Sequence, residues 1–583
     1  MKLKDNKLIT IITYCFFPIF IVLITEFNHM QNFSKLSDFV KYKFPVFLYS
    51  VLLISVLFFA ILFFTKKSHI AVGILSITLY ILSTVEYFKY TTSGTHLTLS
   101  DLVMTQNIGD VGKFAKLNFT WPLIICLILI IGYIVLCKKY TFNLPYTFKR
   151  RFVTSSVCIL ILLLGILLPK PSTNIYAAFN LDNETSTNIF AINESFDSNG
   201  LIGFLSQTTS KEFTSKVRKP ENYSEELVNN TLSEVNTTSD NYKKPNVIFI
   251  MSESFGDFRT FESSFDLSYY YESFDQIAKE NFVGNCVVPT FGGYTPRTEF
   301  ELLFGLPVYS LNTPSIPHNL LTDSNLSNSI PSYFKSLGYT TTYIHPFSGS
   351  FYSRNSIYGG YGFDNLFFEE DMEDESTRFK RYIDDYSVFE KIKKQLKQDN
   401  GPSYIFTTTM QNHQPYYDDE STVDVTANTN ELEYYLEGVK KTSDDLKQFL
   451  EWLNNFDEDV ILVFVGDHYP FFTPTSDIYS HFGINSNTTE NLYNQKYILY
   501  NNYNKDFSYL NDQTISTFYL PYVVIESLGT SLDNFSSTMI NHIETTPIYS
   551  PNIQSINSRD TILDVLTYDR VEGENYSNKQ IVR

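Results

Sequence analysis

The stretch Asp459-Val-Ile-Leu-Val-Phe-Val-Gly-Asp-His468 joins an uninterrupted apolar run to an acid and a histidine that follow it directly. An apolar run of this length predicts a strand covered on both faces, which is typical of a parallel sheet. Residues 246–254, Asn-Val-Ile-Phe-Ile-Met-Ser-Glu-Ser, repeat the arrangement, with Glu253 after the apolar run. Groups that follow parallel strands gather at the carboxyl edge of the sheet, so we expect Glu253, Asp467 and His468 to meet there.

The rest of the polar part of the chain supports the same class of fold. Further strands are predicted from short apolar runs at residues 340–344, 404–409 and 496–500. Helices are predicted between the strands, for example at residues 298–304, 329–337 and 432–453. Strands that alternate with helices indicate an α/β layered domain, which we assign to residues 245–583.

The beginning of the chain has a different composition. Apolar segments occur at about residues 8–25, 44–64, 69–88, 122–137 and 152–168. Each approaches the length of ~17–25 residues that crosses a bilayer, whereas a cleaved signal peptide would explain the first segment alone. We therefore predict a five-helix transmembrane domain at residues 1–168. Residues 169–244, rich in Asn, Ser, Thr and Glu, are expected to be a juxtamembrane connector, with a disordered linker as the alternative.

The charge is divided between the two parts. Residues 1–170 carry 17 Lys and Arg against 6 Asp and Glu, a net charge of +11. Because the whole chain has a net charge of −19, the remainder has a net charge of −30. Basic residues cluster in alternate loops between the apolar segments, which predicts a cytoplasmic N-terminus and an extracellular α/β domain in the plasma membrane. The acidic domain argues against a nucleic-acid partner and restricts anion recognition to one small site. Outside the apolar segments Cys286 is the only cysteine, which excludes a disulfide within the domain.

The residue types at the predicted sheet edge suit a metal ion. Glu253, Asp467 and His468 offer two hard oxygens and an imidazole, a set appropriate for Mn²⁺ or Zn²⁺ and not for a metal that requires thiolates. Taken singly, an Asp-His pair after a strand is more often part of a turn or a helix cap than part of a metal site. The three groups together in an α/β frame favour the metal site.

A third element is Phe291-Gly-Gly-Tyr-Thr-Pro-Arg-Thr-Glu-Phe300. Two glycines precede Thr295, which is predicted at the N-cap of a helix with Pro296 in the first helical position. The pattern has two interpretations. It can be a plain helix cap, or it can hold a hydroxyl nucleophile where the helix N-terminus attracts a phosphate.

Glu253 after the first strand, Thr295 at the start of a helix and the strand-end Gly466-Asp467-His468 resemble the alkaline phosphatase and sulfatase superfamily. With five preceding spans, the chain most resembles the lipoteichoic acid synthases, which are membrane-anchored glycerophosphate transferases of Gram-positive bacteria. The resemblance implies one Mn²⁺, with Mg²⁺ or Zn²⁺ as alternatives, held by Glu253, Thr295, Asp467 and His468. It also implies that Thr295 is the nucleophile.

Two further segments resemble substrate-binding motifs of that family. Residues 343–355, Tyr-Ile-His-Pro-Phe-Ser-Gly-Ser-Phe-Tyr-Ser-Arg-Asn, contain His345 and Arg354, and Gln411-Asn-His-Gln-Pro-Tyr416 contains His413. The resemblance assigns these three side chains to the phosphate and glycerol of the substrate. Arginine suits this role because its planar fork can pair with phosphate oxygens. Departures from the family pattern occur at Tyr352, at Pro296-Arg297 and after Tyr469, and they leave the identity of the transferred unit open.

The function implied is transfer of glycerophosphate from phosphatidylglycerol to a lipid-anchored polymer of the lipoteichoic acid type through a phospho-threonine intermediate. One alternative is transfer of phosphoethanolamine or another phospho-alcohol to a cell-surface glycan. Sulfatase-like hydrolysis is a weaker one, because sulfatases use a modified Cys or Ser where this chain has Thr295. A catalytically silent binding protein is the alternative from another class, and it would be expected to lack a metal ligand.

Overall fold

The computed structural model describes the chain with the exception of residues 1–6, 99–118, 141–145, 183–188, 213–216, 234–242, 312–315, 322–323, 417–429, 473–476, 486–487, 512, 531, 554–558 and 579–583. Its contacts divide the chain into two compact units. We call them the helical unit, within residues 1–216, and the sheet unit, within residues 217–583. Each unit has a hydrophobic core of its own.

The helical unit is built on long apolar helices. They are α1 (Lys7–Met30), α3 (Phe44–Thr65), α4 (Ser68–Ser93), α7 (Trp121–Tyr140) and α8 (Phe148–Leu167), with the shorter α2 (Phe33–Tyr42) after α1. These five long helices are long and apolar enough to cross a membrane, which confirms the predicted segments as helices. Large apolar side chains remain exposed along α7 and α8, including Ile128 and Leu160, as expected of a surface in contact with lipid.

The predicted connector is helical over much of its length. It contains α9 (Pro169–Ala178) and α10 (Ile189–Glu212) in the helical unit, and α11 (Glu225–Thr231) in the sheet unit. Gly200 interrupts α10 with φ +63°, and there the Leu201 N–H donates to Glu26 Oε2 at 3.3 Å. A Cβ at Gly200 would lie 2.8 Å from the ring of Phe39, so glycine allows α10 to approach α1 and α2 this closely.

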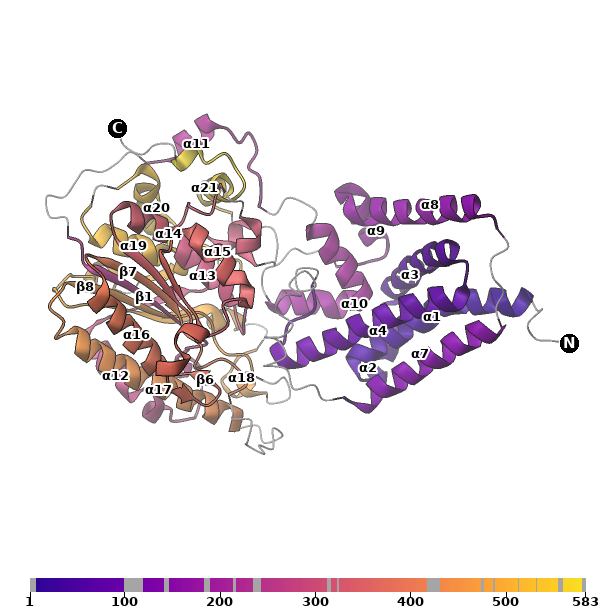
Figure 1. Cartoon of the computed structure of the whole chain (residues 1–583), viewed down its shortest axis with the longest axis horizontal. Coiled ribbons are helices and arrows are strands. Elements are labelled where there is room, and N and C mark those ends of the chain that lie inside the picture. The colour runs from indigo at the N-terminus through magenta and orange to yellow at the C-terminus, as the bar shows by residue number, and fades with distance from the viewer. Residues whose placement is uncertain are drawn as a thin grey trace. The chain divides into compact units, whose positions relative to one another are not determined.

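The sheet unit is organised around an eight-stranded sheet with the order β10-β2-β9-β8-β1-β7-β3-β4. Its strands β1, β7 and β8 are labelled in Figure 1. The strands are β1 (Asn246–Ser252), β2 (Phe282–Val287), β3 (Thr340–Ile344), β4 (Asn365–Phe367), β7 (Ser403–Thr408), β8 (Val460–Gly466), β9 (Asn494–Asn501) and β10 (Thr514–Ser516). A separate antiparallel pair joins β5 (Arg378–Phe379) to β6 (Tyr382–Ile383). The five strands predicted from the apolar runs are therefore present.

The direction of β9 corrects the expectation of a parallel sheet. β9 pairs antiparallel with both β8 and β2, whereas the other described pairings in this sheet are parallel. A strand buried on both faces has the same apolar pattern in either direction, so its sequence could not reveal this. The sequence also missed β2, whose centre is Gly284-Asn285, and the three-residue strands β4 and β10.

Helices cover both faces of the sheet (Figure 1). One face carries α13 (Thr295–Phe304), α14 (Ile330–Ser336), α19 (Leu520–Ser527), α20 (Asn534–Thr545) and α21 (Thr561–Val571), and the other carries α12 (Glu272–Glu280), α16 (Asp385–Gln398) and α17 (Asn430–Leu453). Val247, Phe249 and Met251 of β1 pack into the same cluster as the apolar side chains of α13 and α19. Ile248 and Ile250 alternate with them and are also fully buried, on the opposite face.

We expect Gly466, the last residue of β8, to be essential for placing Asp467. A Cβ at Gly466 would lie 2.0 Å from the backbone oxygen of Phe255, which cannot rotate away as a side chain would. Gly466→Ala should therefore lower the free energy of unfolding by about 1–3 kcal/mol.

The measurement is thermal and denaturant unfolding of the full-length protein in detergent, in a Trp121→Phe background. Trp452 is then the only tryptophan and reports on the sheet unit. Gly359→Ala is the matched control, because a Cβ there would meet nothing within 4 Å. Equal stability of the two variants would contradict the prediction.

Candidate active site

Two neighbouring strands deliver the metal-type ligands to one point. β1 and β8 are paired in parallel with Ser252 opposite Gly466, so both strands end at the same level of the sheet. Glu253 follows β1, and Asp467 and His468 follow β8. Each of the three residues is at most 3% exposed. In the described part of the chain, these three side chains form a group whose possible ligand atoms all lie within 4.8 Å of one another.

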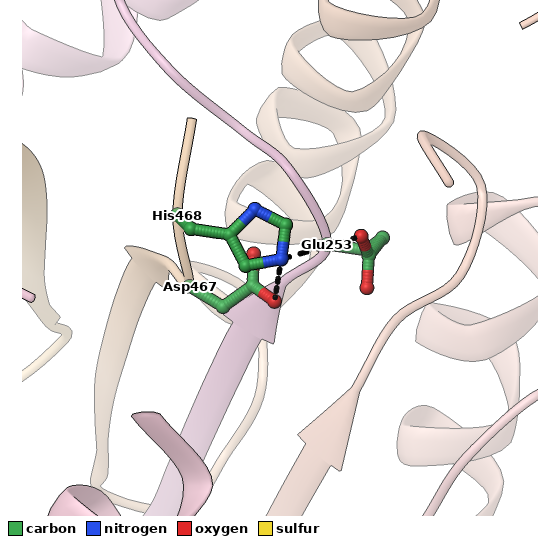
Figure 2. Close-up of side chains that lie close together, drawn as sticks. All are labelled: Glu253, Asp467 and His468. Carbon is green, nitrogen blue, oxygen red and sulfur yellow. Dashed lines mark ion pairs between the residues drawn. The ribbon is translucent and has the colours of Figure 1, made fainter. Parts of the chain in front are cut away.

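The imidazole of His468 is oriented toward the two carboxylates (Figure 2). Its Nδ1 lies 2.9 Å from the backbone oxygen of Tyr469, so Nδ1 carries the hydrogen and Nε2 is the acceptor. Nε2 is 3.2 Å from Asp467 Oδ2 and 3.9 Å from Glu253 Oε1. Within the described residues, neither His468 Nε2 nor Asp467 Oδ2 has a hydrogen-bond partner. Two orphaned buried acceptors that face each other fit a bound cation.

The electrostatics of the cluster lead to the same conclusion. Burial raises the pKa of Asp467 to about 7. Burial and the neighbouring charge of Asp467 also raise the pKa of Glu253, and burial lowers that of His468. Two buried carboxylates therefore repel each other, and a divalent cation would relieve the repulsion. The two oxygens and one nitrogen match Mn²⁺, Zn²⁺ or Mg²⁺ by type.

Thr295 lies beside this cluster at the start of α13. Its hydroxyl donates to Glu253 Oε2 at 3.4 Å. The expectation that Thr295 is the N-cap residue is wrong, because Tyr294 occupies the N-cap with φ 60° and Thr295 is the first helical residue. Gly292 and Gly293 have positive φ angles of 69° and 148°, and Tyr294 is also in the left-handed region. The N-cap therefore lies one residue earlier than predicted. Pro296 lies in the first turn of the helix, where backbone N–H groups have no partner within the helix, so the missing N–H of proline costs no hydrogen bond.

The predicted substrate residues His345 and Arg354 form a pair. His345 follows β3, and its Nδ1 lies 2.9 Å from the backbone oxygen of Thr408, which makes Nε2 the acceptor. Arg354 begins the short helix α15 (Arg354–Ile357), and its Nη1 lies 3.3 Å from that Nε2. Burial, reinforced by the charge of Arg354, lowers the pKa of His345 to about 3. The ring is therefore neutral at physiological pH.

The backbone that leads into Arg354 is strained. Tyr352 and Ser353 both have left-handed conformations, with φ of 57° and 58°. Such a conformation costs roughly 1–2 kcal/mol for a residue other than glycine, so tertiary packing must hold it. The result is that the Tyr352 ring lies 5.2 Å from the guanidinium carbon of Arg354, at one of the positions that depart from the family pattern.

Sequence reasoning missed Glu299. This carboxylate is 1% exposed and forms a buried ion pair with Arg354, with a distance of 3.0 Å between Oε2 and Nη2. The planar fork expected to face a phosphate therefore faces Glu299 instead. Glu299 lies four residues after Thr295 on a predicted helix, and this spacing places both on one helical face, a signal that was available in the sequence.

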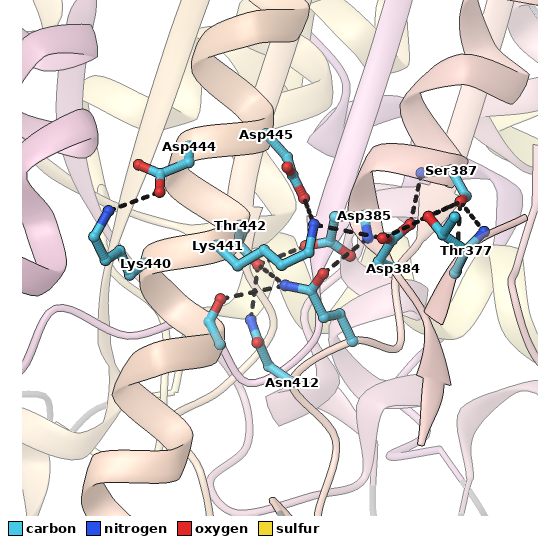
Figure 3. A network of polar contacts seen from close by, with 12 residues as sticks. Thr377, Asp384, Asp385, Ser387, Asn412, Lys440, Lys441, Thr442, Asp444 and Asp445 are labelled. Carbon is cyan, nitrogen blue, oxygen red and sulfur yellow. Dashed lines mark hydrogen bonds and ion pairs between the residues drawn. The ribbon is translucent and has the colours of Figure 1, made fainter. Parts of the chain in front are cut away.

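A polar network fixes the loop that carries His413 (Figure 3). Thr442 of α17 accepts hydrogen bonds from Gln411 and Asn412, both at 3.0 Å, and donates to Asp385 of α16 at 2.6 Å. The Asp385 N–H donates to Gln411 Oε1 at 3.1 Å. Burial raises the pKa of Asp385 to about 7. The helices α16 and α17 thus determine where the His413 loop lies.

The predicted site residues form one cluster at the sheet edge. His413 interacts electrostatically with Glu253, His468 and Arg354, and His345 interacts with Arg354 and His413. The strand ends, α13 and α15 therefore bring together residues from distant parts of the chain.

His318 was not among the predicted site residues. It is buried, with 6% exposed, and its ring lies 6.5 Å from the rings of Tyr352 and Tyr358.

Comparison with known proteins shows which proteins this chain resembles. The sulfatase family matches residues 245–530. The chain is 34% identical over 251 residues to a Rhizobium meliloti protein named for the modification of cyclic β-1,2-glucan, which covers 41% of this chain and 37% of that protein. It is 25% identical over 350 residues to lipoteichoic acid synthase 2 of Bacillus subtilis, which covers 53% of each. The chain thus spans about half or less of the length of these relatives.

A solved structure has the same fold. The Streptococcus pyogenes phosphoglycerol transferase GacH, in complex with sn-glycerol-1-phosphate, matches with a TM-score of 0.51 and 20% sequence identity. The match covers 63% of this chain and 98% of that chain. Residues 245–530 therefore match the sulfatase family, the chain is similar in sequence to a lipoteichoic acid synthase, and its fold is that of a phosphoglycerol transferase structure.

Proposed function

We propose that this chain is a metal-dependent phosphoglycerol transferase that moves glycerophosphate from phosphatidylglycerol to a lipid-anchored polymer outside the cell. The observation that carries this proposal is the Thr295 hydroxyl, which donates to Glu253 in a buried cluster with Asp467 and His468. A hydroxyl nucleophile beside a metal-type ligand set suits phosphoryl transfer. Relatives named as a lipoteichoic acid synthase and a phosphoglycerol transferase support the choice of transferred unit.

Glu253, Thr295, Asp467 and His468 would hold the cation. Mn²⁺ is the proposed ion, and Mg²⁺ or Zn²⁺ are compatible with the same donor atoms. When bound, the ion supplies charge stabilisation for the phosphate and lowers the pKa of the threonine hydroxyl. The chain contributes the burial and the fixed tautomer of His468, which directs Nε2 toward the two carboxylates.

The first step of the proposed reaction is attack by Thr295 Oγ1 on the phosphorus of phosphatidylglycerol. An Oγ1–P bond forms, the bond from phosphorus to the diacylglycerol oxygen breaks, and diacylglycerol leaves as the alcohol after it takes up a proton. The Thr295 hydroxyl donates to Glu253 Oε2, so its proton would leave toward Glu253. Thr295 then carries a glycerophosphate group as a phosphodiester.

The second step transfers that group to the terminal hydroxyl of the polymer. The polymer oxygen attacks phosphorus, the Oγ1–P bond breaks and Thr295 regains its proton. His345 is neutral and presents Nε2 as an acceptor, and the Nδ1 of His413 donates to the backbone oxygen of Gln414 at 2.6 Å. The ring of His413 can accept the hydrogen of an attacking hydroxyl, whereas His345 Nε2 already faces Arg354 Nη1 and would exchange that contact for one to the substrate.

A second acceptor is favoured by one observation. The relative with 34% identity is named for the modification of a cyclic glucan, which is a glycan and not a glycerophosphate polymer. The same two steps would then end on a sugar hydroxyl. Comparison of the two acceptors, a glucan and a lipid-linked polyglycerophosphate, with one labelled donor separates these candidates.

The nucleophile can be tested by mass spectrometry. Full-length protein in detergent is incubated with Mn²⁺ and phosphatidylglycerol labelled in its glycerol headgroup, without an acceptor. We expect release of diacylglycerol and an adduct the size of glycerophosphate on the peptide that contains Thr295. Thr295→Ala should abolish both, and Thr295→Ser should retain the adduct because it keeps the hydroxyl.

The control is His481→Gln, which replaces an exposed histidine outside the cluster. It should form the adduct as the unmodified protein does. Diacylglycerol release that persists in Thr295→Ala, or an adduct on another residue, would reject the proposed mechanism.

Metal binding gives an independent test. Glu253→Gln and Asp467→Asn each remove one charged ligand and keep the side-chain volume, so we expect the affinity for Mn²⁺ to fall by at least about 100-fold. Titration calorimetry and the metal content of dialysed protein measure this loss, with His481→Gln as the control. Undiminished Mn²⁺ affinity in both variants would show that the cluster is not the metal site.

A further inference from the structure

Glu299 has more polar contacts than packing alone requires. Its Oε1 accepts from the Tyr343 hydroxyl at 3.0 Å and the Thr408 hydroxyl at 2.6 Å, and its Oε2 accepts from the Tyr358 hydroxyl at 2.7 Å. Arg354 Nε lies 3.2 and 3.3 Å from the two oxygens, and Nη2 lies 3.0 Å from Oε2. Glu299 is therefore held by groups from β3, β7 and the segment that begins with α15.

This arrangement determines which groups the guanidinium of Arg354 contacts. Nε and Nη2 both donate to Glu299. Nη1 lies on the other side, 3.3 Å from His345 Nε2 and 3.4 Å from the backbone oxygen of Phe351. A phosphate would therefore not meet the Nε–Nη2 edge of the guanidinium, and at Nη1 it would replace one of these two acceptors.

The pair also removes the net charge of Arg354. Burial alone would raise the pKa of Glu299, but the charge of Arg354 and hydrogen bonds from Thr408, Arg354 and Tyr358 lower it to about 2. Glu299 is ionised at neutral pH, while the adjacent His345 is neutral. Arg354 thus offers a hydrogen-bond donor within a pair whose charges cancel.

Glu299 and Thr295 lie one turn apart on α13, a helix whose ten residues are all buried. Resting on the proposed function, we propose that Glu299 is a specificity-determining residue that matches the site to a phosphodiester monoanion over a phosphomonoester dianion. It does so by cancelling the charge of Arg354, with which it forms a buried ion pair.

The chemistry of the two ligand classes explains the preference. A phosphodiester such as a glycerophospholipid headgroup carries one negative charge, whereas a phosphomonoester carries nearly two above its second pKa of about 6. A free positive charge beside the phosphate would favour the dianion. A cancelled charge removes that advantage and leaves the hydrogen bond from Nη1, which both classes can use.

The test measures binding and not turnover. Full-length protein with Mn²⁺ in detergent is titrated at pH 8 with glycerophosphoglycerol, the diester, and with glycerol phosphate, the monoester. Glu299→Gln adds one net positive charge near the phosphate, so the ratio of the two affinities should shift about tenfold toward the monoester. Arg354→Gln removes one positive charge, so the ratio should shift in the opposite direction.

Two controls separate charge from structure. Tyr358→Phe removes one hydrogen bond to Glu299 without changing the charge, and Glu301→Gln replaces another buried glutamate of α13, whose Oε1 accepts from the Val308 N–H and which forms no ion pair with Arg354 in the described structure. Both should keep the affinity ratio of the unmodified protein. If Glu299→Gln does not fold, Arg354→Gln carries the test of sign.

The outcomes are distinguishable. Opposite shifts in the two charge variants support the inference. An unchanged ratio in folded variants that bind both probes overturns it and leaves the proposed transferase intact. If the unmodified protein binds neither probe, the proposed function fails and the inference fails with it.

Discussion

The parallel pairing of β1 with β8, with Ser252 opposite Gly466, is the constraint on which the candidate active site depends. It makes two strands end at one level, so Glu253 and Asp467 leave the sheet side by side. Gly466 permits this approach because a Cβ there would collide with the backbone of Phe255. The fold thus buries two carboxylates together, and the free-energy cost of that burial is what a divalent cation would offset.

Helix α13 is the second element that organises the site. All ten of its residues are buried, and it begins with Thr295 directly after a left-handed turn. One turn later it holds Glu299, which fixes Arg354. Thr295, the proposed nucleophile, and Arg354 are therefore placed by one helix that packs on the sheet, while α16 and α17 place His413 through Thr442 and Asp385. Catalytic geometry of this kind needs such support from surrounding elements.

Much of this could be predicted from the sequence, because local patterns carry it. The five apolar helices and the strands that precede Glu253 and Asp467 follow from runs of apolar residues. The direction of β9 could not be predicted, because burial on both faces looks alike in either direction. The N-cap position of Thr295 was misplaced by one residue, because the conformation of Tyr294 depends on its packing and not on its residue type.

The sequence by itself determined which chemical groups are available: acids and a histidine after two strands, a threonine at a helix start, and a bundle of apolar helices. Only the tertiary structure decided how they are used. It selected the tautomers of His345 and His468 through backbone oxygens of other segments and of the next residue, and it turned the fork of Arg354 toward Glu299, 55 residues away. The physical reason is that tautomers, ion pairs and pKa values depend on neighbours in space, which folding brings together from distant parts of the chain.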